Sequence, residues 1–281
     1  MQYPISNIPP RMRNTVRIVS GALFAVLLAA CAVSQQQEVA LGANSAAQVS
    51  AQLPLIRDAA VTSYMRSLGA QLTRVTDDRN LAWTFVVVDS KEVNAFALPG
   101  GWVYVNRGLI ERATDMSQLA GVMAHEIGHV TRRHSVQQLQ QAQQANVGVT
   151  LLCTLTKVCE SGASQAAINV GGTALFAKFS RGDESEADAE AVSTTVKAGI
   201  SPRGIPTLFQ VLLNARQADP GALTAFFATH PLEEDRIRAT EALIAKFPAR
   251  EISRLTQDSK AFQAFRRRLQ SLPPSPTPKA P

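Results

Sequence analysis

The pattern of apolar and polar residues predicts a mainly helical chain with one β-rich region. Apolar side chains recur every four residues from Ile56 to Leu72, which predicts an amphipathic helix over residues 56–75. Residues 81–89 (LAWTFVVVD) are rich in β-branched residues and almost continuously apolar, as in a strand with little exposure. Residues 94–106 (NAFALPGGWVYVN) predict two short extended runs around a Pro-Gly-Gly turn.

The second half of the chain is predicted to be helical. Residues 116–140 contain no proline and predict one long helix, and further helices are expected at residues 183–198, 203–216 and 232–246. Residues 146–179 are apolar and rich in Gly and Ala, so they fit either a buried helical hairpin or a lid or membrane-facing surface. The fold class expected from this pattern is α+β, mainly helical with a small sheet.

The N-terminus resembles a bacterial secretion signal. Arginines precede an apolar run over residues 18–34, which is too short to span a bilayer comfortably and ends in small residues. Its ending LAAC resembles the lipobox, which implies cleavage before Cys31 and a diacylglycerol on its sulfur. Ala32 favours sorting to the outer membrane of a Gram-negative bacterium, with the protein in the periplasm. An uncleaved anchor or a secreted protein is the alternative, and the chain can start at Met1 or Met12.

Composition divides the chain into four parts. We expect a lipoprotein signal peptide at residues 1–30, a Gln/Ala/Ser-rich tether at 31–50 that is followed by a short helix, one domain at 51–250 and a basic, Pro-rich tail at 251–281 whose end is disordered. Removing the signal removes three arginines, which lowers the net charge from +6 to 6 − 3 = +3. A charge this small, without a basic stripe interleaved with aromatic residues, predicts no nucleic-acid partner.

The cysteines agree with an envelope protein. Cys31 would carry the lipid, which leaves Cys153 and Cys159 in an oxidising compartment. These two residues form either a disulfide or two buried thiols, and the sequence leaves both open.

Residues 122–135 (VMAHEIGHVTRRHS) contain candidate metal-binding and catalytic residues. They contain His-Glu-x-x-His, the motif of zinc hydrolases. On a helix, His125 and His129 project from one face and can hold one Zn²⁺ ion. Glu126 lies beside that face, where it can take a proton from a water and return it to the leaving amine. The motif therefore predicts a metal-dependent peptidase.

The third metal ligand must come from another segment. On a continuous helix His134 lies about 140° around the axis from His129, so we expect it to be a partly exposed helix residue. The acidic run at 179–191 places Glu184 and Asp188 on one helical face. In glutamate-type zinc proteases a carboxylate on a second helix completes the site, and another receives the N–H of a ligating histidine. Glu184 and Asp188 fit these two roles, whereas a solvated acidic face is the alternative.

At this point the sequence resembles the HtpX/BepA-type zinc metallopeptidases, relatives of the CaaX-prenyl proteases. The motifs NAFALPGG, LAGVMAHEIGHVTRRHS, SRGDESEAD and ATHPLEEDRI follow one another in the order of that family. The resemblance implies a zincin-like domain with one Zn²⁺ on His125, His129 and Glu184, and with Glu126 as catalytic residue. The lipobox and the lack of a C-terminal repeat make the chain most similar to short lipoprotein members such as LoiP.

That resemblance suggests an endopeptidase acting on unfolded or misassembled envelope proteins. The alternative is a chaperone-like factor of the outer-membrane assembly machinery with little turnover. The segment Asn94, Ala95, Phe96 and Ala97 could hold an extended substrate along an edge strand beside the active-site cleft, or form an ordinary hairpin.

The resemblance also places His230 at the cleft. This residue could donate to the oxyanion, act as an inhibitory fourth metal ligand, or cap a helix. We favour the inhibitory ligand.

Overall fold

The computed structural model describes residues 33–143, 178–218, 223–230 and 234–276. Residue contacts divide the chain into two units, Met1–Ser34 and Gln35–Pro281. The predictions for Cys31, for the pair Cys153 and Cys159, and for nearly all of residues 146–179 lie outside the described residues.

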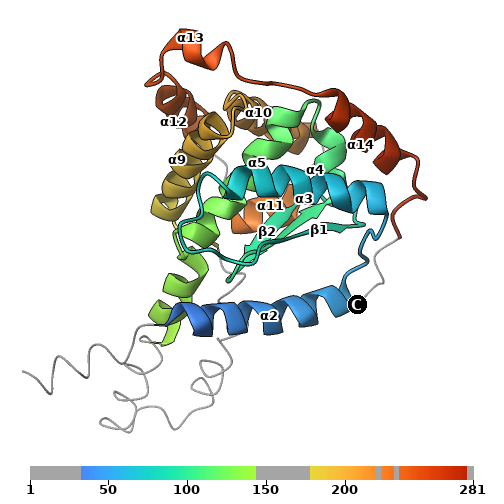
Figure 1. Cartoon of the computed structure of the whole chain (residues 1–281), viewed down its shortest axis with the longest axis vertical. Coiled ribbons are helices and arrows are strands. Elements are labelled where there is room, and N and C mark those ends of the chain that lie inside the picture. Colours follow the sequence, from blue (N-terminus) through green and yellow to red (C-terminus); the bar gives the residue numbers. More distant parts are fainter. Residues whose placement is uncertain (1–32, 144–177, 219–222, 231–233, 277–281) are drawn as a thin grey trace, which may run out of the picture. The chain divides into compact units, whose positions relative to one another are not determined.

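The second unit combines helices with one small sheet (Figure 1), which confirms the α+β fold class. The helices are α2 (Gln35–Gln52), α3 (Ala59–Thr73), α4 (Arg107–Arg112), α5 (Met116–Thr131), α9 (Arg181–Lys197), α10 (Gly204–Ala218), α11 (Thr224–Thr229), α12 (Glu234–Ile244), α13 (Ala249–Ile252) and α14 (Lys260–Gln270). The strands are β1 (Thr84–Val88), β2 (Ala95–Leu98) and β3 (Trp102–Asn106). In the described residues, no helix is long and apolar enough to cross a membrane.

The sheet has the order β1-β3-β2. Strands β1 and β3 are parallel, whereas β2 and β3 form the antiparallel hairpin expected from the Pro-Gly-Gly turn. Gly100 and Gly101 adopt φ angles of 77° and 104°, a region that only glycine enters without strain. This order leaves β2 at the edge of the sheet, as the sequence predicted.

Helices cover both faces of the sheet. On one face, Val87 and Val103 belong to the main core with α3 and α5. On the other, Val88 and Tyr104 pack with Ala46 of α2. Both sets of side chains are buried, which explains why the β-rich segment is apolar at nearly every position instead of alternating.

The N-terminal boundary differs from the prediction. Instead of a tether followed by a short helix, residues 35–52 form one helix, α2, and the carboxylate of Glu38 in its first turn is fully buried. Glu38 forms ion pairs of 3.0 Å with Arg79 and 2.7 Å with Arg133. Composition could not reveal this helix, because the groups that pair with Glu38 lie about forty and ninety-five residues away in the sequence.

The domain also extends beyond residue 250, where the sequence placed its end. Beyond residue 250, helix α14 buries Phe262, Phe265 and Leu269 in the main core. The ring of Phe265 stacks on Tyr64 of α3 with the ring centroids 4.4 Å apart. The basic cluster at 266–268 therefore belongs to a helix that packs on the domain.

The long helix predicted over residues 116–140 is interrupted. Helix α5 ends at Thr131, and Arg133 adopts a left-handed φ of 61° before the chain becomes helical again at residues 134–143. The prediction of one continuous helix was therefore wrong. A left-handed φ costs a non-glycine residue about 1–3 kcal/mol and is rare, so nothing in the sequence indicates a break at Arg133. The ion pair with Glu38 helps to hold Arg133 in this conformation.

Candidate metal centre

Helix α5 carries His125, Glu126 and His129 into the interior of the domain. Its N-terminus is capped by Asp115, whose side chain accepts a hydrogen bond from the backbone N–H of Gln118. Every residue from Met116 to Val130 is buried, so the motif helix is surrounded by protein on all sides. Both imidazoles are therefore held in fixed orientations by packing.

Helix α9 packs closely against α5 and supplies the carboxylates. It begins with a capping box between Ser180 and Asp183. A side chain at Gly128 would lie only 3.3 Å from the Cα atom of Ala187, so the glycine of the motif permits the close approach of the two helices. This approach places Glu184 beside the two histidines.

The three predicted ligands lie close enough together to hold one ion. The Nε2 atoms of His125 and His129 lie 3.0 Å apart, and they lie 3.5 Å from Oε2 and Oε1 of Glu184, respectively. Ligand atoms about 2.1 Å from a tetrahedral Zn²⁺ would be roughly 3.4 Å apart. Two imidazole nitrogens and one carboxylate oxygen are also the donors that catalytic zinc prefers. The residues present therefore fit this ion.

His230 completes a cluster of four groups whose ligand atoms all lie within 4.8 Å of one another. It follows α11, is 1% exposed, and its Nδ1 atom lies 2.9 Å from Glu184 and 3.4 Å from Nε2 of His125. The Nε2 atom on the other side of the ring is 3.5 Å from the carboxylate of Glu126. The side chain thus faces the other three groups of the cluster and Glu126.

Glu126 is buried beside this cluster. It is 1% exposed, and neither carboxylate oxygen has a hydrogen-bond partner among the described residues. Burial raises the pKa of Glu126. An unpaired buried carboxylate is unfavourable, so its position next to the ligands suits a group that handles protons during a reaction.

Asp188 lies where the sequence placed it, one turn after Glu184. Its Oδ1 atom is 3.0 Å from Nδ1 of His125, the ring nitrogen that faces away from the cluster. Such a contact fixes the orientation and the tautomer of a ligating histidine.

Arg236 of α12 is the functional residue that sequence reasoning missed. Its guanidinium donates two hydrogen bonds to Asp188, at 2.7 and 2.9 Å, and lies 2.5 Å from Glu184. Burial alone would lower the pKa of Arg236, but the hydrogen bonds to Asp188 outweigh it and raise the pKa. Two carboxylates predicted on one buried helix face were the available signal, because such a face requires a cation.

Burial and contacts between the side chains of the cluster shift the pKa values of its members. Burial alone would lower the pKa of His125, but its hydrogen bonds to Asp188 and Glu184 raise that pKa to about 10. Burial lowers the pKa of His129 well below its usual value. Burial would raise the pKa of Glu184, yet hydrogen bonds with the three histidines hold it far below the usual range. A metal ion would therefore compete with a proton at His125 for a preformed anionic site.

The prediction for His134 was wrong. This residue is 1% exposed, not partly exposed, and its Nδ1 atom lies 2.9 Å from Nδ1 of His129. The break at Arg133 removes the helical geometry on which the prediction depended, and it turns the imidazole back toward α5. Asp183 and Glu186 have carboxylate oxygens 3.9 and 3.6 Å from Nε2 of His134.

The edge strand lies against α5, but its side chains divide between the two faces of the sheet. Ala95 and Ala97 contact the main core. Asn94 and Phe96 line a cavity of about 600 Å³ on the other face, together with residues such as Leu53 and Asp89. None of the residues that line this cavity belongs to the histidine cluster, so within this strand the backbone, rather than Asn94 and Phe96, is the candidate for holding a substrate near the ligands.

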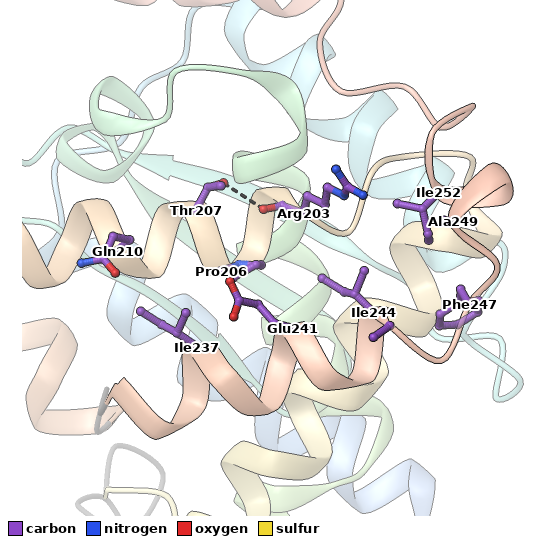
Figure 2. A pocket seen from close by; sticks show the side chains of 11 residues that line it. Arg203, Pro206, Thr207, Gln210, Ile237, Glu241, Ile244, Phe247, Ala249 and Ile252 are labelled. Carbon is purple, nitrogen blue, oxygen red and sulfur yellow. Dashed lines mark hydrogen bonds between the residues drawn. The ribbon is translucent and has the colours of Figure 1, made fainter.

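A second cavity lies between α10 and α12 (Figure 2). It has a volume of about 720 Å³. Ile237, Glu241 and Ile244 of α12 face Pro206 of α10 across it. None of its eleven lining residues belongs to the histidine cluster, so it offers no part of the metal centre.

The model of Peptidase family M48 matches residues 56–244 of the 281. The chain belongs to Peptidase family M48. The members of this family are metallopeptidases, and all four groups of the histidine cluster lie within the matched residues. The family resemblance read from the four motifs is therefore confirmed.

Several M48 relatives are bacterial proteases. The chain is 32% identical over 208 residues to the beta-barrel assembly-enhancing protease of Escherichia coli O157:H7. This match covers 72% of this chain and 42% of the relative. It is 32% identical over 162 residues to Metalloprotease YcaL of Escherichia coli strain K12, covering 57% of this chain and 62% of the relative. It is 30% identical over 152 residues to Metalloprotease LoiP of the same strain, and this match covers 54% of this chain and 59% of the relative. The chain spans less than half the length of the beta-barrel assembly-enhancing proteases it matches.

Proposed function

We propose that this M48 protein is a zinc-dependent endopeptidase with His125, His129 and Glu184 as metal ligands. The observation that carries the proposal is the convergence of two Nε2 atoms, 3.0 Å apart, on the carboxylate of Glu184, which lies 3.5 Å from each of them. Bound Zn²⁺ would supply Lewis acidity that polarises the scissile carbonyl and activates a water. Asp188 orients the ring of His125, and Arg236 balances the charge of Glu184.

Glu126 would then act as general base and general acid. Its unpaired carboxylate lies next to the ligands, where it can take a proton from the attacking water. The same proton would pass to the leaving amine, which completes hydrolysis of the peptide bond. Burial raises the pKa of Glu126, which makes its carboxylate a stronger proton acceptor.

Replacement of the third ligand tests the zinc assignment. Glu184→Ala should lose bound zinc, because two histidines alone do not complete a catalytic zinc site. Metal analysis of the purified protein after equilibration with zinc measures this, with the wild type expected to hold one ion per chain. An unchanged zinc content in the variant would refute the role of Glu184.

The proposed substrates are unfolded or misassembled proteins of the cell envelope. The names of the beta-barrel assembly-enhancing proteases support this proposal, as does the position of β2 at the edge of the sheet beside α5. A second candidate function, a chaperone-like factor of the outer-membrane assembly machinery, would use the same surface with little turnover. Hydrolysis of an unfolded protein such as casein distinguishes the two functions.

The proposed location is the periplasm, with a lipid anchor in the outer membrane of a Gram-negative bacterium. The lipobox ending in Cys31 supports it. Cys31→Ser should release the protein from the membrane fraction into the soluble periplasmic fraction, because the lipid chains supply the attachment. Fractionation of cells measures this, and a variant that still sediments with membranes would contradict the anchor.

His230 is proposed to restrain the resting enzyme as a fourth ligand. Its Nδ1 atom lies 3.4 Å from Nε2 of His125 and 2.9 Å from Glu184, at the corner that a catalytic water needs. If the state in which His230 occupies the fourth position is populated about ten times more than the state in which that position is free, the rate falls roughly tenfold. His230→Ala should therefore raise the rate of casein hydrolysis by about that factor.

The competing role of His230 predicts that the same substitution lowers the rate of hydrolysis instead of raising it. If this side chain donates to the oxyanion, His230→Ala should lower kcat by roughly a hundredfold. Steady-state kinetics of the variant separate the two roles. An unchanged rate would contradict both.

A further inference from the structure

His134 is a buried histidine that the proposed mechanism does not use. Its ring lies edge-on to that of His129, with the ring centroids 5.0 Å apart at 74° and the two Nδ1 atoms 2.9 Å apart. The Nε2 atom on the opposite side of the His129 ring faces Glu184 and His125. His129 thus stands between the metal ligands and His134.

A histidine that binds a metal through Nε2 keeps its proton on Nδ1 and donates it to a neighbouring acceptor. For His129 that neighbour is Nδ1 of His134. His134 must then carry its own proton on Nε2, where the carboxylates of Glu186 and Asp183 lie 3.6 and 3.9 Å away. We propose that His134 is a positioning residue whose Nδ1 accepts the hydrogen bond of His129 and fixes the orientation and tautomer of this ligand. This inference rests on the proposed zinc site.

The two ligating histidines would then have different partners. His125 is held by Asp188, a carboxylate that is itself neutralised by Arg236. A carboxylate in the place of His134 would add a buried negative charge close to the carboxylates of Asp183 and Glu186. A neutral imidazole orients His129 without that cost, which gives a physical reason for a histidine at this position.

The turn after α5 is what brings His134 into reach. On a continuous helix its side chain would lie about 140° around the axis from His129. Arg133 breaks the helix at φ 61°, and Glu38 of α2 forms a 2.7 Å ion pair with its Nε atom. Arg79, paired with the same carboxylate, donates to the carbonyl of Val130 at 2.7 Å. Helix α2 therefore supports the strained turn that positions His134.

A matched pair of variants tests the proposed acceptor. His134→Asn keeps an acceptor oxygen close to the position of Nδ1, whereas His134→Leu has a side chain of similar size without an acceptor. We expect zinc affinity, measured by competition with a chelator, to fall about 10- to 100-fold in His134→Leu. His134→Asn should stay within about threefold of the wild type, because it restores the hydrogen bond.

Thermal unfolding of the zinc-free proteins shows whether each variant folds, and His134→Ala supplies a second variant without an acceptor. Equal zinc affinity of the wild type and the two acceptor-free variants would overturn the inference. Equal losses in His134→Asn and His134→Leu would also overturn it, because the acceptor would not be the cause. A wild-type protein that binds no zinc would instead remove the proposed function, and this inference with it.

Discussion

Glu126→Gln is expected to reduce casein hydrolysis about 10²- to 10⁴-fold while the zinc content stays unchanged. Glutamine has the size of glutamate but cannot take a proton from the attacking water. Glu126 lies beside the ligand cluster, with both carboxylate oxygens unpaired among the described residues, so the substitution breaks no hydrogen bond described there. The loss should therefore be confined to the chemical step.

Rates of casein hydrolysis and metal analysis of the same samples measure this effect. Glu241→Gln is the matched control, because it makes the same chemical change at an exposed residue outside the histidine cluster, and its rate should equal that of the wild type. Retained hydrolysis in Glu126→Gln would contradict the role of Glu126. Loss of zinc from that variant would mean that the carboxylate holds the metal centre together.

Arg236→Met should lower the free energy of unfolding of the zinc-free protein by about 3–5 kcal/mol. The guanidinium is the cation that contacts both Glu184 and Asp188, and only 13% of the arginine side chain is exposed. Methionine fills a similar volume but removes the guanidinium from two buried carboxylates, which then keep only their contacts with the histidines among the described residues. Removing one member of a buried ion pair costs more than the pair itself contributes, because the other charge remains desolvated.

Denaturant unfolding of the zinc-free proteins measures this change. Arg238→Met, two residues further along α12, is the matched control, because that side chain is 66% exposed and pairs only with the exposed carboxylates of Glu234 and Asp235. The control should change the free energy of unfolding by less than about 0.5 kcal/mol. Equal stability of the two variants would contradict the account of the buried charges.

Patterns within short stretches of the sequence were sufficient to predict much of the fold and of the candidate site. Spacing within one helix places His125 and His129 on one face, and the same rule relates Glu184 to Asp188. The hairpin follows from the Pro-Gly-Gly turn, because the positive φ angles of Gly100 and Gly101 are a property of glycine itself. These features depend on neighbours in the sequence.

The features that sequence reasoning missed depend on distant partners. The break at Arg133 rests on an ion pair with Glu38, ninety-five residues away, and it decides where His134 points. Arg236 contacts Asp188 from forty-eight residues away. Helix α2 has a Gln/Ala/Ser-rich sequence that looks like a tether, and its packing on the sheet is what makes it part of the domain. Tertiary contacts of this kind override local propensity.

Casein hydrolysis by the wild-type protein, before and after removal of its metal, tests the central claim most directly. The account predicts cleavage at internal peptide bonds that stops when a chelator strips the protein and returns when one equivalent of Zn²⁺ is restored. Hydrolysis that continues in the stripped protein would contradict a zinc-dependent mechanism. A protein that binds zinc and casein but releases no peptides would contradict the peptidase assignment and favour the chaperone-like factor.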